Sequence, residues 1–193
     1  MAGDTTLIIG LGNPILGDDG VGWVIAQKLK KRFASKSNLE FEFLSLGGLS
    51  LMERLTGYQN VILIDAISSG KHPKGEVVSF PLSAMPDLTA GHTSSSHDTS
   101  LRNALNVGRS MNICLPKDED ILIVAVEAAN VYDFSEELTP PVASAVPVAV
   151  NLVMNLISKM YKGEKYGIHR NAPSLPVLQP SHRRPIQSNR HDR

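Results

Sequence analysis

The amino-acid sequence predicts an α/β protein: a three-layer sandwich in which a twisted, mostly parallel five-stranded sheet carries helices on both faces. Short apolar runs alternate along the chain with amphipathic segments, which is the order typical of parallel strands joined through helices. In the strand expected at residues 60–64, every residue after Asn60 is apolar, as expected for a strand that is covered on both faces. Together these observations indicate a sheet buried between two helical layers.

The first half of the chain begins with a β-rich apolar run at residues 5–9, read as a strand that ends at Gly10. An amphipathic helix is expected from Asp18 or Asp19 to about Phe33, because apolar residues recur there at helical spacing opposite a glutamine- and lysine-rich face. A short helix is expected at residues 49–55. Three further runs of strand length follow the first helix, and the last of them is open to an antiparallel orientation: residues 41–44, 60–64 and 76–80.

The second half of the chain opens with a loop-like stretch at residues 81–97. A helix from about Asp98 to Gly108 and a strand at residues 121–126 are expected next. Thr139-Pro140 is a good N-cap and first-turn pair for a long final helix that ends near Tyr161. Pro147 must either kink this helix or mark its true start.

Length and composition are those of an ordinary globular protein, with 42% hydrophobic and 20% charged residues in a chain of 193. We expect one domain over residues 1–166, followed by a basic tail over residues 167–193. From Arg170 to Arg193 the chain holds five arginines and one aspartate, a net charge of +4, among Pro, Ser, Gln and Asn. This composition predicts a disordered extension without an assigned role.

The single cysteine, Cys114, excludes an internal disulfide framework and a multi-cysteine zinc site. Its apolar neighbours favour a small packed residue over a nucleophile. No stretch approaches the roughly 18 apolar residues of a membrane span, and the N-terminus lacks a basic-then-apolar signal pattern. The sequence therefore predicts a cytoplasmic protein with no membrane partner.

A glycine-rich loop, Gly10–Gly22, joins the first strand to the first helix and carries Asp18 and Asp19 at the helix start. Loops of this kind usually present backbone N–H groups to a phosphate. Two carboxylates would instead repel a phosphate and attract a cation. Ile15 stands where a dinucleotide fingerprint needs its third glycine, and the aspartates stand where a P-loop needs Lys-Ser/Thr. No organic cofactor is expected.

Three polar residues fall at the edge of the sheet where ligands bind in such folds, beyond the carboxyl ends of the parallel strands. Asp19 follows the first strand, Asp65 ends the third, and His97 precedes the next helix. Two carboxylates and one imidazole suit a divalent transition metal with open positions. The same residues could also act in acid–base chemistry on a water molecule. Both possibilities are open at this point.

Each of these residues also has a structural interpretation. One of the two adjacent aspartates is expected to serve only the helix N-terminus, and we assign that role to Asp18, with Asp19 reaching outward. Asp65 could be a turn residue, but a charge in an apolar context needs a partner, which favours function. His97 could equally be a helix-start residue without a special task.

Four segments, in this order along the chain, resemble the hydrogenase maturation endopeptidases: Gly10–Gly22, Ile62–Ile67, Ser96–Leu101 and Asn130–Pro140. The resemblance covers about residues 7–161 and implies the same sandwich fold. It also implies an endopeptidase that trims a C-terminal extension from the precursor of a nickel-containing hydrogenase large subunit, after nickel has been inserted.

The resemblance implies that Asp19, Asp65 and His97 contact the metal and perform the cleavage, with Asp19 at a position where the family often has glutamate. The nickel is then borne by the substrate and recognised there. In one version the three residues bind the substrate's nickel or a water near it. In the other the metal serves recognition only, and a carboxylate such as Asp65 activates the water. The expected partner is the nickel-loaded precursor, with no nucleic acid, and the protein is expected to be a monomer.

Two other functions are compatible with parts of the sequence. A maturation factor could sense metal insertion without cutting. Gly10-Leu-Gly-Asn-Pro14 also resembles the opening of bacterial peptidyl-tRNA hydrolases, but that family continues into a Thr-Arg-His-Asn segment where this chain has Asp18-Asp19-Gly20. The acidic core also lacks the basic face that a tRNA ligand requires.

Overall fold

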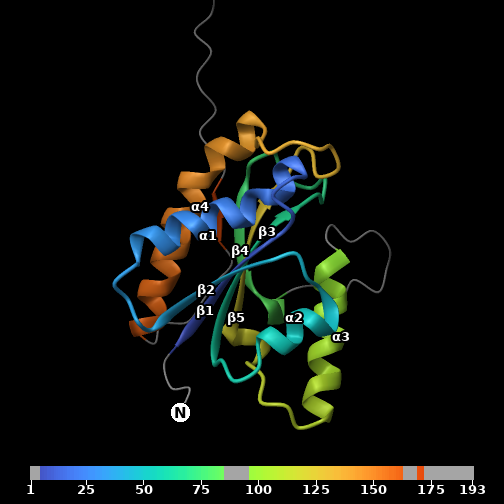
Figure 1. The fold of residues 1–193 in the computed structure, drawn as a ribbon, viewed down its shortest axis with the longest axis vertical. Helices are drawn as coiled ribbons and strands as arrows, with labels where there is room; N and C mark the ends of the chain where they lie inside the picture. The colour runs from blue at the N-terminus through green and yellow to red at the C-terminus, as the bar shows by residue number, and fades with distance from the viewer. Residues whose placement is uncertain (1–4, 85–95, 163–168, 172–193) are drawn as a thin grey trace, which may run out of the picture.

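The structure is a computed structural model, and it describes the backbone of residues 5–84, 96–162 and 169–171 (Figure 1). In chain order its elements are β1 (Thr6–Leu11), η1 (Gly17–Gly20), α1 (Val21–Arg32), β2 (Leu39–Leu44), α2 (Gly48–Arg54), β3 (Asn60–Ile67), β4 (Val77–Pro81), η2 (Leu82–Ala84), α3 (Ser96–Ser110), η3 (Asp118–Asp120), β5 (Ile121–Glu127), α4 (Pro140–Lys162) and β6 (His169–Asn171).

The strands form one twisted sheet in the order β2-β1-β3-β5-β4-β6. The first four strands in this order are parallel, and β4 runs antiparallel to β5. The strands β1 to β5 fall on the five runs expected from the sequence, which are residues 5–9, 41–44, 60–64, 76–80 and 121–126. The mostly parallel α/β sheet is therefore confirmed. The loop expected at residues 81–97 falls mainly on residues 85–95, which lie outside the described part of the chain.

The described sheet has one strand more than expected. Residues 169–171 form β6, which pairs antiparallel with residues 77–79 of β4. The prediction of a disordered tail over residues 167–193 is therefore wrong for these three residues. This strand is defined by its backbone pairing with β4. The disordered tail was predicted from amino-acid composition, which does not reveal backbone pairing. The expected domain boundary at residue 166 stays a prediction.

Helices cover both faces of the sheet, which makes the three layers (Figure 1). Because successive strand residues point to opposite faces, each buried strand supplies both cores. On one side α1 and α4 pack over a core that includes Ile8, Ile62 and Ile64. On the other side α2 and α3 pack over a core that includes Leu7 and Leu63.

Two boundaries differ from expectation in ways that bear on function. The third strand does not end at Asp65 but continues to Ile67, because Asp65 pairs with Ala125 and Ile67 with Glu127 in the ladder between β3 and β5. The helix expected from Asp98 begins two residues earlier, at Ser96, so His97 lies in the first turn of α3 rather than before it.

Helix α4 confirms the long final helix, and Pro147 lies inside it instead of starting it. Among the described residues it is the one helix long and apolar enough to cross a membrane, with a mean hydropathy of 1.6. By this test, the expectation that no stretch approaches a membrane span was wrong. Half of the apolar window is buried inside the protein, because α4 packs against α1 and the sheet as a core helix does.

Cys114 is exposed, which corrects the expectation of a packed residue. Its neighbours Ile113 and Leu115 are the residues that pack, against the core beneath α2 and α3. The segment has no helical or strand assignment, and its alternate residues turn inward and outward. Because Ile113 and Leu115 both point toward the core, Cys114 between them points toward solvent.

Candidate active site

The point where the strand order reverses lies between β1 and β3. The chain passes from β1 to its neighbour β2, and then crosses back to β3 on the other side of β1. The two crossovers use helices on opposite faces, α1 and α2. In open α/β sheets such a reversal leaves a crevice at the carboxyl ends of the two strands, where ligands bind. This topology singles out the ends of β1 and β3.

Helix α1 begins directly over the ends of these two strands. A Cβ atom at Gly22 would lie 2.3 Å from the carbonyl oxygens of both Leu11 and Ile64, so only glycine permits this approach. The 3-10 turn η1, which carries Asp18 and Asp19, also packs against β3. The glycine-rich loop therefore serves close backbone packing at the strand ends.

Asp19 is half-buried and lies over the loop that follows β1. Its Oδ2 atom accepts a hydrogen bond of 2.6 Å from the backbone N–H of Asn13. Within the described residues the Oδ1 atom has no hydrogen bond, so it is the oxygen available to a ligand. The loop thus fixes the carboxylate through one oxygen and leaves the other to interact.

Asp65 lies within β3 and is only 3% exposed. Its Oδ1 atom accepts a hydrogen bond of 2.8 Å from the backbone N–H of Ala66. The register pairs Gly10 with Ile64, so Asp65 is level with the last residue of β1. Strand alternation places it on the face covered by α2 and α3. The structure therefore brings Asp19 and Asp65 to the same edge of the sheet from neighbouring strands.

His97 is the second residue of α3, on the helical layer that covers the face of Asp65. Its side chain lies outside the described part of the structure, so its predicted place beside the two carboxylates stays a prediction. Among the described side chains, no three of His, Cys, Asp and Glu gather closely enough to hold a metal ion. The two aspartates supply carboxylate oxygens that fit part of such a ligand set.

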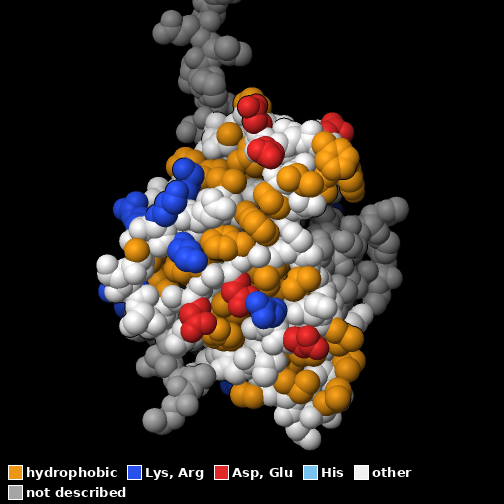
Figure 2. Space-filling view, in the orientation of Figure 1, with side chains coloured by type: hydrophobic (Ala, Val, Ile, Leu, Met, Phe, Trp, Pro, Cys, Tyr) orange, Lys and Arg blue, Asp and Glu red, His pale blue; other side chains and the backbone are white. Residues whose placement is uncertain are grey.

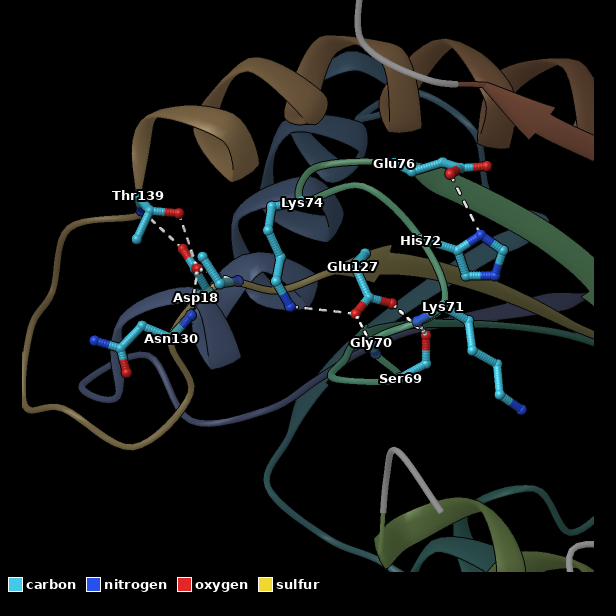
Figure 3. A network of polar contacts seen from close by, with 11 residues as sticks. Asp18, Ser69, Gly70, Lys71, His72, Lys74, Glu76, Glu127, Asn130 and Thr139 are labelled. Carbon is cyan, nitrogen blue, oxygen red and sulfur yellow. Dashed lines mark hydrogen bonds and ion pairs between the residues drawn. The ribbon is translucent and has the colours of Figure 1, made fainter. Parts of the chain in front are cut away.

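Asp18 does not cap a helix, which corrects its predicted role. It is fully buried, and neither η1 nor α1 has a side-chain cap. Its Oδ2 atom accepts hydrogen bonds from the backbone N–H groups of Ala129 and Asn130 at 2.9 and 3.0 Å. Thr139 donates its N–H to Oδ1 at 2.7 Å and its hydroxyl to Oδ2 at 2.9 Å (Figure 3). Asp18 therefore joins the end of β5 to the start of α4.

Glu127 is a buried carboxylate at this edge that the sequence analysis did not single out. It accepts hydrogen bonds from the Ser69 hydroxyl at 2.6 Å and the Gly70 N–H at 2.9 Å, and Lys74 Nζ lies 3.4 Å away (Figure 3). These partners make it a structural anchor for the connection between β3 and β4. The sequence feature that could have pointed to Glu127 is its position directly after the apolar run 121–126, at the end of an expected strand.

Replacing Gly12 with alanine is expected to destabilise the protein by about 2 to 4 kcal/mol and to displace Asp19. Gly12 has a φ of +115°, and a Cβ atom there would lie 1.8 Å from the Asp19 carbonyl oxygen. Gly57→Ala is the matched control, because Gly57 has a φ of +87° with nothing within 4 Å. It should cost only about 1 kcal/mol from backbone strain. Equal losses of unfolding free energy in urea titrations would contradict the assigned clash.

The fold and the residues at the carboxyl ends of β1 and β3 define a class of protein. It is an α/β protein that has carboxylates, and not a phosphate-binding loop, where the strand order reverses. The chain belongs to the hydrogenase maturation protease family, whose model matches residues 24–156. It is thus a peptidase by family, as its four segments suggested. This membership goes against the peptidyl-tRNA hydrolase alternative.

The chain is also similar in sequence to curated relatives and in fold to solved structures. The chain is 24% identical over 173 residues to the hydrogenase expression/formation protein HupD of Bradyrhizobium diazoefficiens, covering 90% of this chain and 85% of that protein. The fold resembles the hydrogenase maturating endopeptidase HybD of E. coli, with a TM-score of 0.68 at 22% identity, over 86% of this chain and 96% of that one. HybD of Thermococcus kodakarensis gives 0.60 at 24% identity, over 79% and 98%.

Proposed function

We propose that this chain removes the C-terminal extension from the precursor of a nickel-containing hydrogenase large subunit once nickel has been inserted. The observation that carries the proposal is that Asp19 and Asp65 lie at the same edge of the sheet, by the carboxyl ends of β1 and β3, in a member of the maturation protease family. Nickel enters as part of the substrate, and no organic cofactor takes part. The protein acts as a cytoplasmic monomer, without nucleic acid or membrane.

The two carboxylates can act in two ways. In the first, Asp19, Asp65 and His97 bind the nickel of the precursor at positions that the hydrogenase leaves open, which places the scissile peptide at this edge. In the second, nickel only positions the substrate. Asp65 then accepts a proton from water, the water oxygen bonds to the scissile carbonyl carbon, and the amide nitrogen leaves carrying a proton.

Intact mass spectrometry of the precursor tests the function. The purified chain is incubated with nickel-loaded and with nickel-free precursor, and only the loaded form should lose the mass of its extension. A loaded precursor that binds the chain but keeps its full mass would indicate a non-catalytic metal sensor instead. Release of the peptide from peptidyl-tRNA by ester hydrolysis would support the peptidyl-tRNA hydrolase alternative.

His97→Ala should reduce trimming of the nickel-loaded precursor at least tenfold, because it removes the one imidazole of the proposed set, whether this group binds the metal or acts in acid–base chemistry. His72→Ala is the matched control. The Nδ1 atom of His72 lies 3.3 Å from Oε2 of Glu76 (Figure 3), and His72 is not one of the three proposed residues. Trimming at the wild-type rate by His97→Ala would remove this histidine from the proposal.

A further inference from the structure

The segment between β5 and α4 displays two aromatic side chains to solvent. We call residues 129–139 the aromatic loop. Tyr132 is 84% exposed and Phe134 is 85% exposed, more than any other large hydrophobic residue in the described part of the chain. Aromatic residues are enriched in protein–protein interfaces, and exposed apolar patches mark interaction sites. In Figure 2, orange side chains gather at the upper right, where Figure 1 shows this loop.

The aromatic loop is held in place at both ends by one buried group. Asp18 accepts hydrogen bonds from Ala129 and Asn130 at the start of the loop and from Thr139 at its end. Inside the loop, the Asn130 side chain accepts from the backbone N–H groups of Tyr132 and Asp133, both at 3.3 Å. A loop ordered before binding loses less conformational entropy when a partner covers it.

The aromatic loop is also joined to the loop that carries Asp19. The backbone N–H of Gly17 donates to Ser135 at 2.7 Å, and the N–H of Ser135 donates to Ile15 at 3.1 Å. Ile15 is itself 47% exposed. A third exposed apolar side chain therefore lies in the loop that is hydrogen-bonded to the aromatic loop and that carries Asp19.

The charge of the aromatic loop indicates which kind of partner surface can cover it. The aromatic loop contains Asp133, Glu136 and Glu137, all exposed, and no Lys, Arg or His. A surface that covers it must therefore bring apolar area to the aromatics and cations to the three carboxylates. A uniformly polar surface would offer no apolar area to the aromatic rings. An acidic surface would repel the three carboxylates.

We infer that the aromatic loop is the docking surface for the body of the precursor, and that it binds an apolar patch with a basic border beside the cleaved segment. This inference rests on the proposed function. Under this inference, different residues near the same edge of the sheet have different roles. Asp19 and Asp65 act on the metal and the peptide, and the aromatic loop binds the folded substrate.

Steady-state trimming of the nickel-loaded precursor tests the inference. The double variant Tyr132→Ser/Phe134→Ser should raise KM at least tenfold and leave kcat within about twofold, because the rings contact the substrate away from the reacting atoms. Tyr161→Ser is the matched control. It makes the same change at an exposed tyrosine near the far end of α4, about 30 Å along the helix from the loop, and should leave KM unchanged.

A second variant tests the charge argument without touching the rings. Glu136→Lys/Glu137→Lys should also raise KM at least tenfold, and raising the salt concentration should increase the KM of the wild type but hardly that of this variant. Both residues are exposed, so the melting temperature should stay close to that of the wild type.

Unchanged KM in both variants would overturn the inference. A loss of self-association in sedimentation runs, with unchanged KM, would also overturn it and assign the loop to a second copy of the chain. Failure of the wild-type chain to trim the precursor is a distinct result, because it contradicts the proposed function and removes the partner named here.

Discussion

Asp65→Asn is expected to slow trimming of the nickel-loaded precursor at least a hundredfold, the scale at which loss of a general base or charged ligand acts. Asparagine has nearly the same shape and can still accept the hydrogen bond from the Ala66 N–H. It has no negative charge, so it can neither take a proton from water nor bind a cation strongly. Single-turnover kinetics measure the loss, and the melting temperature should change by only a few degrees.

Glu127→Gln is the matched control for Asp65→Asn, because it neutralises another buried carboxylate near the same strand ends. Glu127 is engaged by Ser69, Gly70 and Lys74, so its loss should lower stability and leave the trimming rate within a few-fold of the wild type. A comparable loss of rate in both variants would mean that Asp65 acts through the fold and not on the substrate.

Asp18→Ala is expected to lower the free energy of unfolding by about 3 kcal/mol, since hydrogen bonds to charged groups contribute about 1.5 to 3 kcal/mol each and water replaces some of them. For a chain of this length that corresponds to a melting temperature about 6 to 12 °C lower. The effect arises because three backbone N–H groups and one hydroxyl lose their acceptor at once. Thermal and urea unfolding measure it.

Asp19→Ala is the control for stability, because the neighbouring carboxylate is only half-buried and accepts one hydrogen bond, from Asn13. It should cost about 1 kcal/mol. Asp18→Ala should also speed hydrogen exchange at the Asn130 and Thr139 amides, whereas Asp19→Ala should not. Equal stability losses in the two variants would contradict the assignment of Asp18 as the link between β5 and α4.

The layered α/β fold was predictable because local pattern decides it. Short apolar runs rich in Val and Ile, such as residues 61–64 and 121–126, have the length and composition of strands covered on both faces, and the helices between them show apolar faces at helical spacing. The strand β6 was not predictable in this way, because residues 169–171 are recruited by backbone pairing with β4 and not by an apolar pattern.

The candidate site was predictable only in part. Asp19 follows one apolar strand and Asp65 lies near the carboxyl end of its neighbour, so the topology of a parallel sheet brings them to one edge whatever the details of packing. Asp18 was misassigned because its partners, Ala129, Asn130 and Thr139, lie more than a hundred residues further along the chain. Spacing within a loop predicts a helix cap and does not reveal such distant contacts.

The affinities of the chain for nickel-loaded and for nickel-free precursor test the roles of Asp19 and Asp65. If Asp19 and Asp65 recognise the metal that the substrate carries, the wild type should bind the loaded form at least tenfold more tightly. The variant Asp19→Ala/Asp65→Asn should bind both forms alike, at the affinity of the wild type for the nickel-free form. A preference for the loaded precursor that persists in this variant would contradict the central role given to the two aspartates.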